Sequence, residues 1–257
     1  MAEAVVARKD RAMDRNIDGI IDGVADQVVA WRRHMHANPE LSFEEYETSK
    51  FITSILEGLE GIEVSHPSGT SVVGRLRGKR PGPVIAIRAD FDALPISEDT
   101  GLPFASKNEG VMHACGHDGH TSILLGAAKV LSGMRDDLQG EIRFLFQHGE
   151  ETPPGGARGM IEGGAMDGVD RVIGLHLWSP IEIGTVMVNP TRVMAACDIF
   201  RIEVKGKGGH NIGKLGGWCV HSLLSAAVPN RAFERSLVSA ECSRYPLRAD
   251  VPDFGRR

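Results

Sequence analysis

The chain has 257 residues, of which 42% are hydrophobic and 25% charged, and its formal net charge is −5. This composition is ordinary for a globular protein of one large domain, or one domain with a small second one, and the negative balance argues against nucleic-acid binding. No apolar run is long enough to span a membrane, no secretory signal is recognisable, and the four cysteines are scattered, so we expect a cytoplasmic protein without disulfides.

Two amphipathic helices are expected near the N-terminus. Apolar residues at helical spacing predict the first over residues 15–36, and the turn at 38–40 ends it. The second is predicted over 44–59, with Ser42 as its N-cap and Glu45 completing a capping box.

Strands alternate with helices from residue 71 onward. Short β-rich runs bounded by Gly and Pro predict strands over 71–76 and 84–88, and the second run is almost entirely apolar, as in a strand buried on both faces. The elements predicted next are a helix over 121–131, a strand over 141–147, a helix over 156–164 and a strand over 171–176. This order predicts an α/β fold, with a mixed, mostly parallel sheet and helices on both faces.

The pattern changes again near residue 194. Apolar and polar residues alternate from Ile199 to Lys205, which predicts a half-exposed strand that ends in a glycine-rich segment. We therefore expect a first domain over 1–193 and the start of a small α+β domain over 194–257.

The densest group of metal-binding residue types lies at 115–120, where Cys115, His117, Asp118 and His120 stand among glycines. Thiolate, imidazole and carboxylate together suit zinc, or manganese and its neighbours. A buried free cysteine beside a solvated histidine is the simpler alternative, but so dense a neighbourhood favours ligands. We expect Cys115 and His117 to bind metal, and Asp118 and His120 to support them.

Two pairs of carboxylates follow predicted strands. Glu150 and Glu151 are compatible with a solvated acidic turn, but adjacent carboxylates can also divide two tasks, one binding metal and the other accepting a proton from water. Asp92 is placed to orient a metal ligand. For Asp90 two interpretations are equally good: it belongs to the same site, or it is a loop aspartate that caps a turn.

His176 ends the predicted strand over 171–176. A single histidine at a strand end is usually structural, but in open α/β sheets ligands bind outside the carboxyl ends of the strands, where the other two clusters also lie. We therefore expect His176 to join them in a hydrolytic metal centre. Spacing alone assigns no role to His34, His36, His66, His113, His148 or His221.

Several segments, in order along the chain, resemble the amidohydrolase branch of the co-catalytic metallopeptidases, which contains hippurate hydrolase, N-acyl-amino-acid amidohydrolases and the indole-acetyl-amino-acid hydrolases of plants. They include RRHMHANPELSFEE (32–45), IRADFDALPI (87–96), MHACGHDGHTSILLGAAK (112–129), FLFQHGEE (144–151), GLHLW (174–178) and VKGKGGH (204–210). The match spans about residues 15–210, and the segments together are far more specific than any one of them.

The resemblance implies a catalytic domain with two divalent metal ions, zinc or manganese, with nickel and cobalt also possible, and an inserted lid through which full-length relatives form homodimers. It implies four metal ligands: Cys115, His117, Glu151 and His176.

The resemblance also implies a reaction, the hydrolysis of the amide bond in a small N-acyl amino acid such as hippurate. Glu150 would be the general base and then the proton donor, Asp92 would orient an imidazole, and His210 would help polarise the scissile carbonyl. Dipeptidases and aminopeptidases of the wider family are the less favoured alternative, because they usually carry a carboxylate in place of Cys115.

The resemblance ends after His210. Relatives complete the lid and return to the catalytic domain, which supplies a last metal-binding histidine, whereas residues 211–257 show one short apolar stretch at 220–228 and no sustained period. We therefore expect an aberrant or frameshifted tail from about residue 211, an incomplete catalytic domain and weak or no activity. A non-catalytic remnant that binds only metal is the alternative of a different class.

Overall fold

The computed structural model describes residues 17–188, 204–206 and 240–242. Nearly all of them belong to one compact unit, Val6–Val186. In the other unit, strands β6 (Val204–Gly206) and β7 (Ala240–Cys242) pair in parallel. The predicted strand over 199–205 is described only at its end, and His210 and nearly all of the predicted tail lie outside the described residues.

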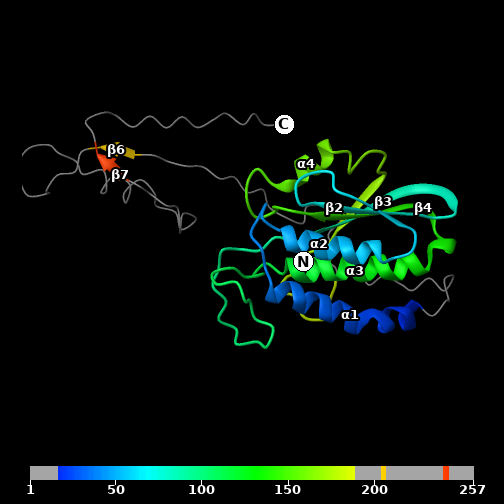
Figure 1. Cartoon of the computed structure of the whole chain (residues 1–257), viewed down its shortest axis with the longest axis horizontal. Helices are drawn as coiled ribbons and strands as arrows, with labels where there is room; N and C mark the ends of the chain where they lie inside the picture. Colours follow the sequence, from blue (N-terminus) through cyan, green and yellow to red (C-terminus); the bar gives the residue numbers. More distant parts are fainter. Residues whose placement is uncertain (1–16, 189–203, 207–239, 243–257) are drawn as a thin grey trace, which may run out of the picture. The chain divides into compact units, whose positions relative to one another are not determined.

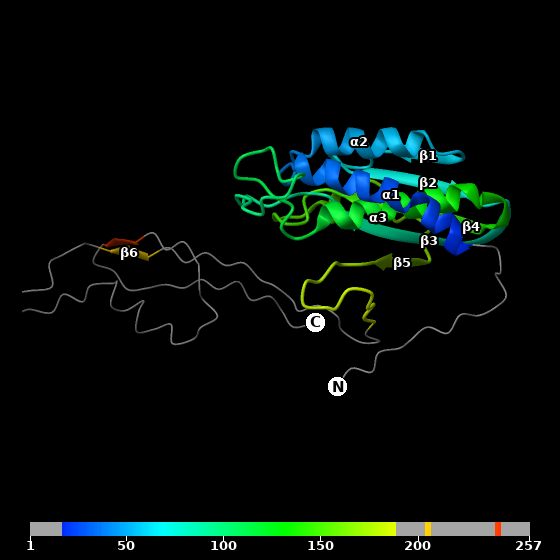
Figure 2. The ribbon, with the colours of Figure 1, turned by 90° about the horizontal axis from the view of Figure 1, so that it is seen from below.

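A five-stranded mixed sheet in the order β1-β2-β4-β3-β5 forms the centre of the larger unit (Figures 1 and 2). Its strands are β1 (Ile62–Ser65), β2 (Val72–Arg77), β3 (Arg80–Asp90), β4 (Gln139–Gln147) and β5 (Arg171–Gly174). Strand β2 is antiparallel to both of its neighbours, whereas β3 is parallel to β4 and to β5. All strands of this sheet except β2 therefore run in one direction, which confirms the predicted mixed, mostly parallel sheet.

Helices cover both faces of this sheet. Helices α1 (Ile17–Ala37), α2 (Tyr46–Glu57) and α3 (His117–Gly133) lie on one face, and α4 (Gly156–Glu162) lies on the other (Figure 1). Residues on the strands alternate between two cores, because successive side chains of a strand point to opposite faces. Phe144 and Phe146 pack in the core that includes Ile52, whereas Leu145 packs with Met160 of α4.

Several predicted boundaries differ from the observed ones. Helix α3 begins four residues before the predicted start at 121, and β5 ends at Gly174, two residues before His176. Strand β1 and the short 3-10 helix Arg135–Asp137 had no clear sequence signal. Among the described residues, no helix is both long and apolar enough to cross a membrane.

The predicted capping box at α2 is wrong. Helix α2 begins at Tyr46, and the side chain of its N-cap, Glu45, makes no capping hydrogen bond. The Glu40 carboxylate instead accepts two backbone N–H groups of the first turn. The Glu45 carboxylate is buried and accepts hydrogen bonds from other segments, while the Ser42 hydroxyl donates to Asp92. Tertiary hydrogen bonds thus replace the local ones that the spacing predicted.

Candidate metal centre

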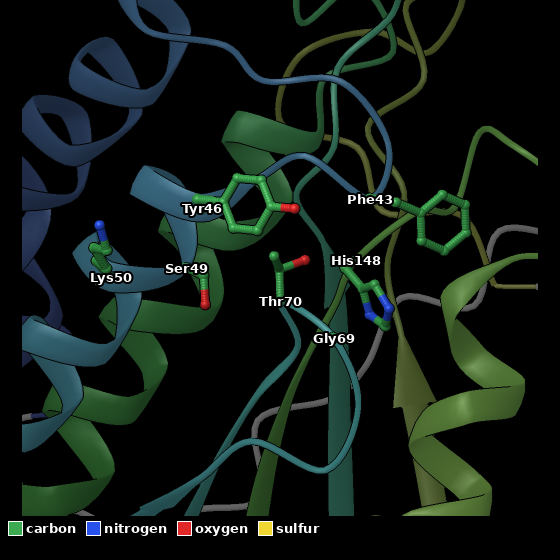
Figure 3. Close-up of a pocket in the computed structure, with 7 residues that line it drawn as sticks. All are labelled: Phe43, Tyr46, Ser49, Lys50, Gly69, Thr70 and His148. Atoms are coloured by element: carbon green, nitrogen blue, oxygen red, sulfur yellow. The ribbon is translucent and has the colours of Figure 1, made fainter.

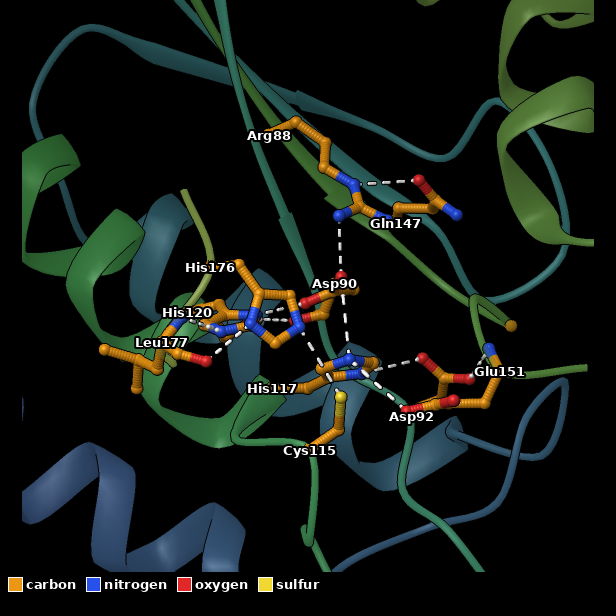
Figure 4. Close-up of polar contacts among 12 residues, drawn as sticks. Arg88, Asp90, Asp92, Cys115, His117, His120, Gln147, Glu151, His176 and Leu177 are labelled. Atoms are coloured by element: carbon orange, nitrogen blue, oxygen red, sulfur yellow. Dashed lines mark hydrogen bonds and ion pairs between the residues drawn. The ribbon is translucent and has the colours of Figure 1, made fainter. Parts of the chain in front are cut away.

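The carboxyl ends of β3, β4 and β5 meet at one edge of the sheet. In the parallel register, Asp90 at the end of β3 pairs with Gln147 at the end of β4, and Arg88 pairs with Gly174 at the end of β5. The turn with Glu150 and Glu151 follows β4, and the segment with His176 follows β5. The three clusters predicted from the sequence therefore come together at this edge (Figure 4).

Cys115 and His117 reach this edge from the start of α3. Gly116, the N-cap, has φ 89°, in the left-handed region that glycine tolerates best. This turn lets donors two residues apart approach one point: Cys115 Sγ lies 3.5 Å from His176 Nε2, and the donor atoms of Cys115, His117 and His176 lie within 4.8 Å of one another.

A second group of donors shares His117 with the first. His117 Nε2 lies 3.6 Å from Glu151 Oε1, and the donor atoms of His117, Glu150 and Glu151 lie within 4.8 Å of one another. The buried Asp92 holds both sides of this group. Its Oδ1 lies 3.2 Å from His117 Nδ1, and its Oδ2 accepts the Glu151 N–H at 2.9 Å. With Nδ1–H turned to a carboxylate, the neutral imidazole directs its Nε2 lone pair into the site.

A third group combines Asp90, His117 and His120. Here the donor atoms of Asp90 and His120 already have partners, because His120 Nδ1 lies 2.6 Å from Asp90 Oδ1 and Arg88 donates to Asp90 Oδ2 at 2.6 Å. Asp118 belongs to none of the three groups. It accepts hydrogen bonds from His36 and Arg32 of α1.

Carboxylates dominate the electrostatics of the site. Burial alone would raise the pKa of Asp90, but the hydrogen bond from His120 and the nearby His117 and Arg88 lower it to about 2. Burial lowers the pKa of His117, yet Asp92, Asp90 and Glu151 more than offset this and raise it. The excess of negative charge around one imidazole favours a bound cation.

Two further groups beside these donors have raised pKa values. Burial, together with the Glu151 charge, raises the pKa of the Glu150 carboxyl. Burial also raises the pKa of the Cys115 thiol, to about 12, with the help of a hydrogen bond to Glu151 and the charges nearby. Without a cation, Cys115 is therefore a neutral thiol, and it becomes a thiolate when it ligates a metal.

The donors present fit a divalent metal ion. His117 Nε2 and Glu151 Oε1 are buried and have no hydrogen-bond partner within the part of the chain that the structure describes. Such unpartnered atoms are rare and costly in a folded interior, and a cation between them would satisfy both. Nitrogen, oxygen and sulfur donors together suit a borderline ion such as zinc.

The turn after β4 is held by Glu45, a residue to which the sequence had assigned only a helix cap. Glu45 Oε1 accepts the Gly149 N–H at 2.8 Å and the Phe43 N–H at 2.9 Å, and its Oε2 accepts the Thr70 hydroxyl at 2.7 Å. The spacing of Glu45 along the chain carries no signal of this role. These bonds fix the backbone directly before Glu150.

A pocket lies beside this braced turn, outside the donor groups. Its lining residues come from the start of α2, from the loop before β2 and from the end of β4: Phe43, Tyr46, Ser49, Lys50, Gly69, Thr70 and His148 (Figure 3). None of them belongs to a donor group, so the pocket and the candidate metal centre are separate features.

The chain is similar in sequence and in fold to known metallopeptidases and amidohydrolases. Residues 86–252 match the profile of peptidase family M20/M25/M40. This range extends beyond residue 211, and the aberrant tail predicted from there stays a prediction. The chain is 60% identical over 183 residues to an N-acyl-L-amino acid amidohydrolase of Geobacillus stearothermophilus, covering 71% of this chain and 50% of that protein.

Two proteins of Bacillus subtilis are similar over the same part of the chain. An N-acetyl-L-cysteine deacetylase is 50% identical over 186 residues, covering 72% of this chain and 44% of that protein. The crystal structure of a dinuclear metal binding peptidase of the M20 family superposes with a TM-score of 0.58 and 47% identity, covering 60% of this chain and 43% of that one. The chain thus spans about half the length of these relatives.

Proposed function

The chain belongs to peptidase family M20/M25/M40, and from this membership we propose that it hydrolyses the amide bond of N-acyl amino acids with the help of divalent metal ions. The observation that carries the proposal is the convergence of Cys115, His117, Glu151 and His176, with Glu150 beside them. The similarity to proteins named for amidohydrolase and deacetylase activity supports this substrate class.

We assign Cys115, His117, Glu151 and His176 as metal ligands of a centre for two divalent ions, zinc or manganese, with nickel and cobalt as options. The buried unpartnered atoms of His117 and Glu151 support this assignment. When bound, the ions would polarise the substrate carbonyl and ease the deprotonation of water. Asp92 orients His117 through its Nδ1.

Glu150 is the proposed general base. Its carboxylate is exposed at the mouth of the donor group, and its raised pKa brings it closer to the range in which a carboxylate both accepts and returns a proton. It would take a proton from the attacking water at a side-chain oxygen and return it to the leaving nitrogen. His210, outside the described residues, is the proposed partner for the carbonyl oxygen.

The test uses the purified 257-residue chain loaded with Zn²⁺ or Mn²⁺, together with a panel of N-acyl amino acids and dipeptides. Any hydrolysis should depend on the metal and act on N-acyl amino acids, at the weak level expected from the sequence. Glu150→Gln should lower the rate by at least about 100-fold with unchanged metal content, since a general base contributes about that much. The exposed Glu109→Gln is the matched control.

The other outcomes identify the alternatives. Hydrolysis of dipeptides alone would place the chain with the peptidases of the family. Metal binding without hydrolysis of any substrate would favour the non-catalytic remnant. A chain that binds neither metal would overturn the proposed centre itself.

A further inference from the structure

His176 lies on a segment that the sheet does not hold. The pairing of β5 with β3 ends at Gly174, and residues 171–178 are exposed. Within the described part of the chain, Nδ1 of the His176 ring lies 2.5 Å from the Leu177 carbonyl oxygen, and Nε2 lies 3.5 Å from Cys115 Sγ. Something other than strand pairing must fix this segment if His176 is to serve as a ligand.

The buried His120 of α3 provides the fixed point. The Leu177 N–H donates to His120 Nε2 at 2.8 Å, and His120 Nδ1 lies 2.6 Å from Asp90 Oδ1 (Figure 4). Because a backbone N–H can only donate, Nε2 must carry the lone pair, and Nδ1 must carry the hydrogen that Asp90 accepts. Both ring nitrogens of His120 are therefore hydrogen-bonded to groups of the protein.

This hydrogen bonding distinguishes His120 from its neighbours. Its ring centroid lies 4.5 Å from that of His176 and 5.3 Å from that of His117, close enough for it to be taken for another ligand. It has no free lone pair to offer a cation. His117 differs, because its Nε2 has no hydrogen-bond partner among the described residues.

A series of side-chain contacts anchors His120 to the sheet. Arg88 donates through Nη1 to Asp90 Oδ2 at 2.6 Å and through Nε to Gln147 Oε1 at 2.9 Å. Asp90 and Gln147 are the last residues of β3 and β4. The backbone of Leu177 is thus connected, through His120, Asp90 and Arg88, to strands β3 and β4.

The packing of the Leu177 side chain gives independent support. A Cβ at Gly119 would lie 2.4 Å from Leu177 Cδ1, so the leucine side chain packs directly against this glycine. Backbone and side chain of Leu177 both dock on the first turn of α3.

We infer that His120 is a positioning residue, which anchors the backbone at Leu177 and thereby holds the His176 imidazole against Cys115 and His117. The inference rests on the proposed function only in taking His176 as a metal ligand. The docking itself needs no metal. Asp90 keeps the His120 ring in the tautomer that this contact requires.

The first test is amide hydrogen exchange of the metal-free, full 257-residue chain, followed at Leu177 by NMR. We expect the Leu177 amide to be protected in the wild type and to exchange at least about 10-fold faster in His120→Ala. His120→Gln should restore part of the protection, because its amide offers one acceptor and one donor. His34→Ala, which removes an exposed imidazole of α1, is the matched control and should change nothing at Leu177.

The second test is titration with Zn²⁺ or Mn²⁺. His120→Ala should weaken the affinity by about 10- to 100-fold, as loss of a ligand-orienting group does, while a cobalt–thiolate absorption band from Cys115 persists in the Co²⁺ form. His120→Gln should lie between Ala and the wild type.

Nitrogen-15 NMR of the wild-type imidazoles keeps the inference testable even if a variant does not fold. His120 should show a protonated Nδ1 and an unprotonated Nε2 with and without Zn²⁺. A metal-bound signature on His120, or a Leu177 amide that exchanges freely in the wild type, would overturn the inference. A wild-type chain with a protected Leu177 amide and no metal affinity would support the docking and count against the proposed function instead.

Discussion

Asp92 joins the two halves of the candidate metal centre, since its carboxylate accepts both the Nδ1–H of His117 and the backbone N–H of Glu151. Burial raises the pKa of Asp92, but these bonds and that from Ser42 outweigh burial and lower it, so the group is a carboxylate at neutral pH. One buried side chain thereby sets the orientation of an imidazole and the path of a turn.

We predict that Asp92→Asn weakens metal binding. A carboxamide has one oxygen acceptor, so its NH₂ group must face either the His117 Nδ1–H or one of the donors now bonded to Oδ2. The affinity for Zn²⁺ should fall by about 10- to 100-fold, measured by isothermal titration calorimetry. Asp99→Asn, at an exposed position, should bind as the wild type does; equal affinity in both variants would contradict the orienting role.

Glu45→Gln should destabilise the fold. The buried carboxylate accepts from two backbone N–H groups and from the Thr70 hydroxyl, and the amide cannot accept all three. Leaving a buried donor without its acceptor costs about 1–3 kcal/mol of unfolding free energy, which urea denaturation of the metal-free chain would measure. The neighbouring exposed Glu44→Gln is the control. Equal stability of the two variants would exclude a role of the Glu45 carboxylate in holding the turn after β4.

His113 should make the metal-free fold sensitive to acid. Burial lowers its pKa from 6.5 to about 4, and neither ring nitrogen has a hydrogen-bond partner in the described residues. The unfolded chain therefore binds more protons between these two pH values, and the free energy of unfolding falls as the pH drops through this range, by roughly 3 kcal/mol from this residue.

Replacement of this histidine by an apolar residue of similar size tests the point. His113→Leu should unfold with a shallower dependence on pH between 6.5 and 4 than the wild type, while keeping its stability at neutral pH. Chemical denaturation at several pH values gives the comparison, with the exposed His34→Leu as the control. Parallel curves for His113→Leu and the wild type would show that His113 is not buried as a neutral imidazole.

Cys115 should alkylate slowly in the metal-free chain. Only the thiolate reacts with iodoacetamide, and at pH 8 a thiol whose pKa is raised to about 12 is almost entirely protonated. Peptide mass spectrometry after timed alkylation, with a free-cysteine peptide as the reference, would measure the rate. A Cys115 that reacts as fast as the reference peptide would contradict the carboxylate-rich, half-buried environment of this thiol.

The donor residues could be predicted from the sequence because each belongs to a short, dense motif at a strand or helix end. Cys115 and His117 stand two apart beside a glycine, and Glu151 and His176 each follow a run typical of a strand. Such local patterns also predicted the parallel strands, whose common direction brings these ends together.

The supporting contacts could not be predicted in this way. Spacing suggested that Glu45 caps a helix, but a buried turn and a hydroxyl more than twenty residues away compete for the same carboxylate. The contact of His120 with the Leu177 N–H involves a backbone group, which leaves no trace in the sequence. Contacts that depend on how separate elements dock become visible only in the folded chain.

The left-handed backbone at Gly116 bears on how this site could change over evolution. Exchanging Cys115 for aspartate replaces one donor with another and leaves the turn intact. A side chain at Gly116, with φ 89°, would cost about 1–2 kcal/mol and would shift the donors on both sides of it. The preference for one metal over another is therefore within reach of single substitutions, whereas the location of the site depends on a residue that has no side chain.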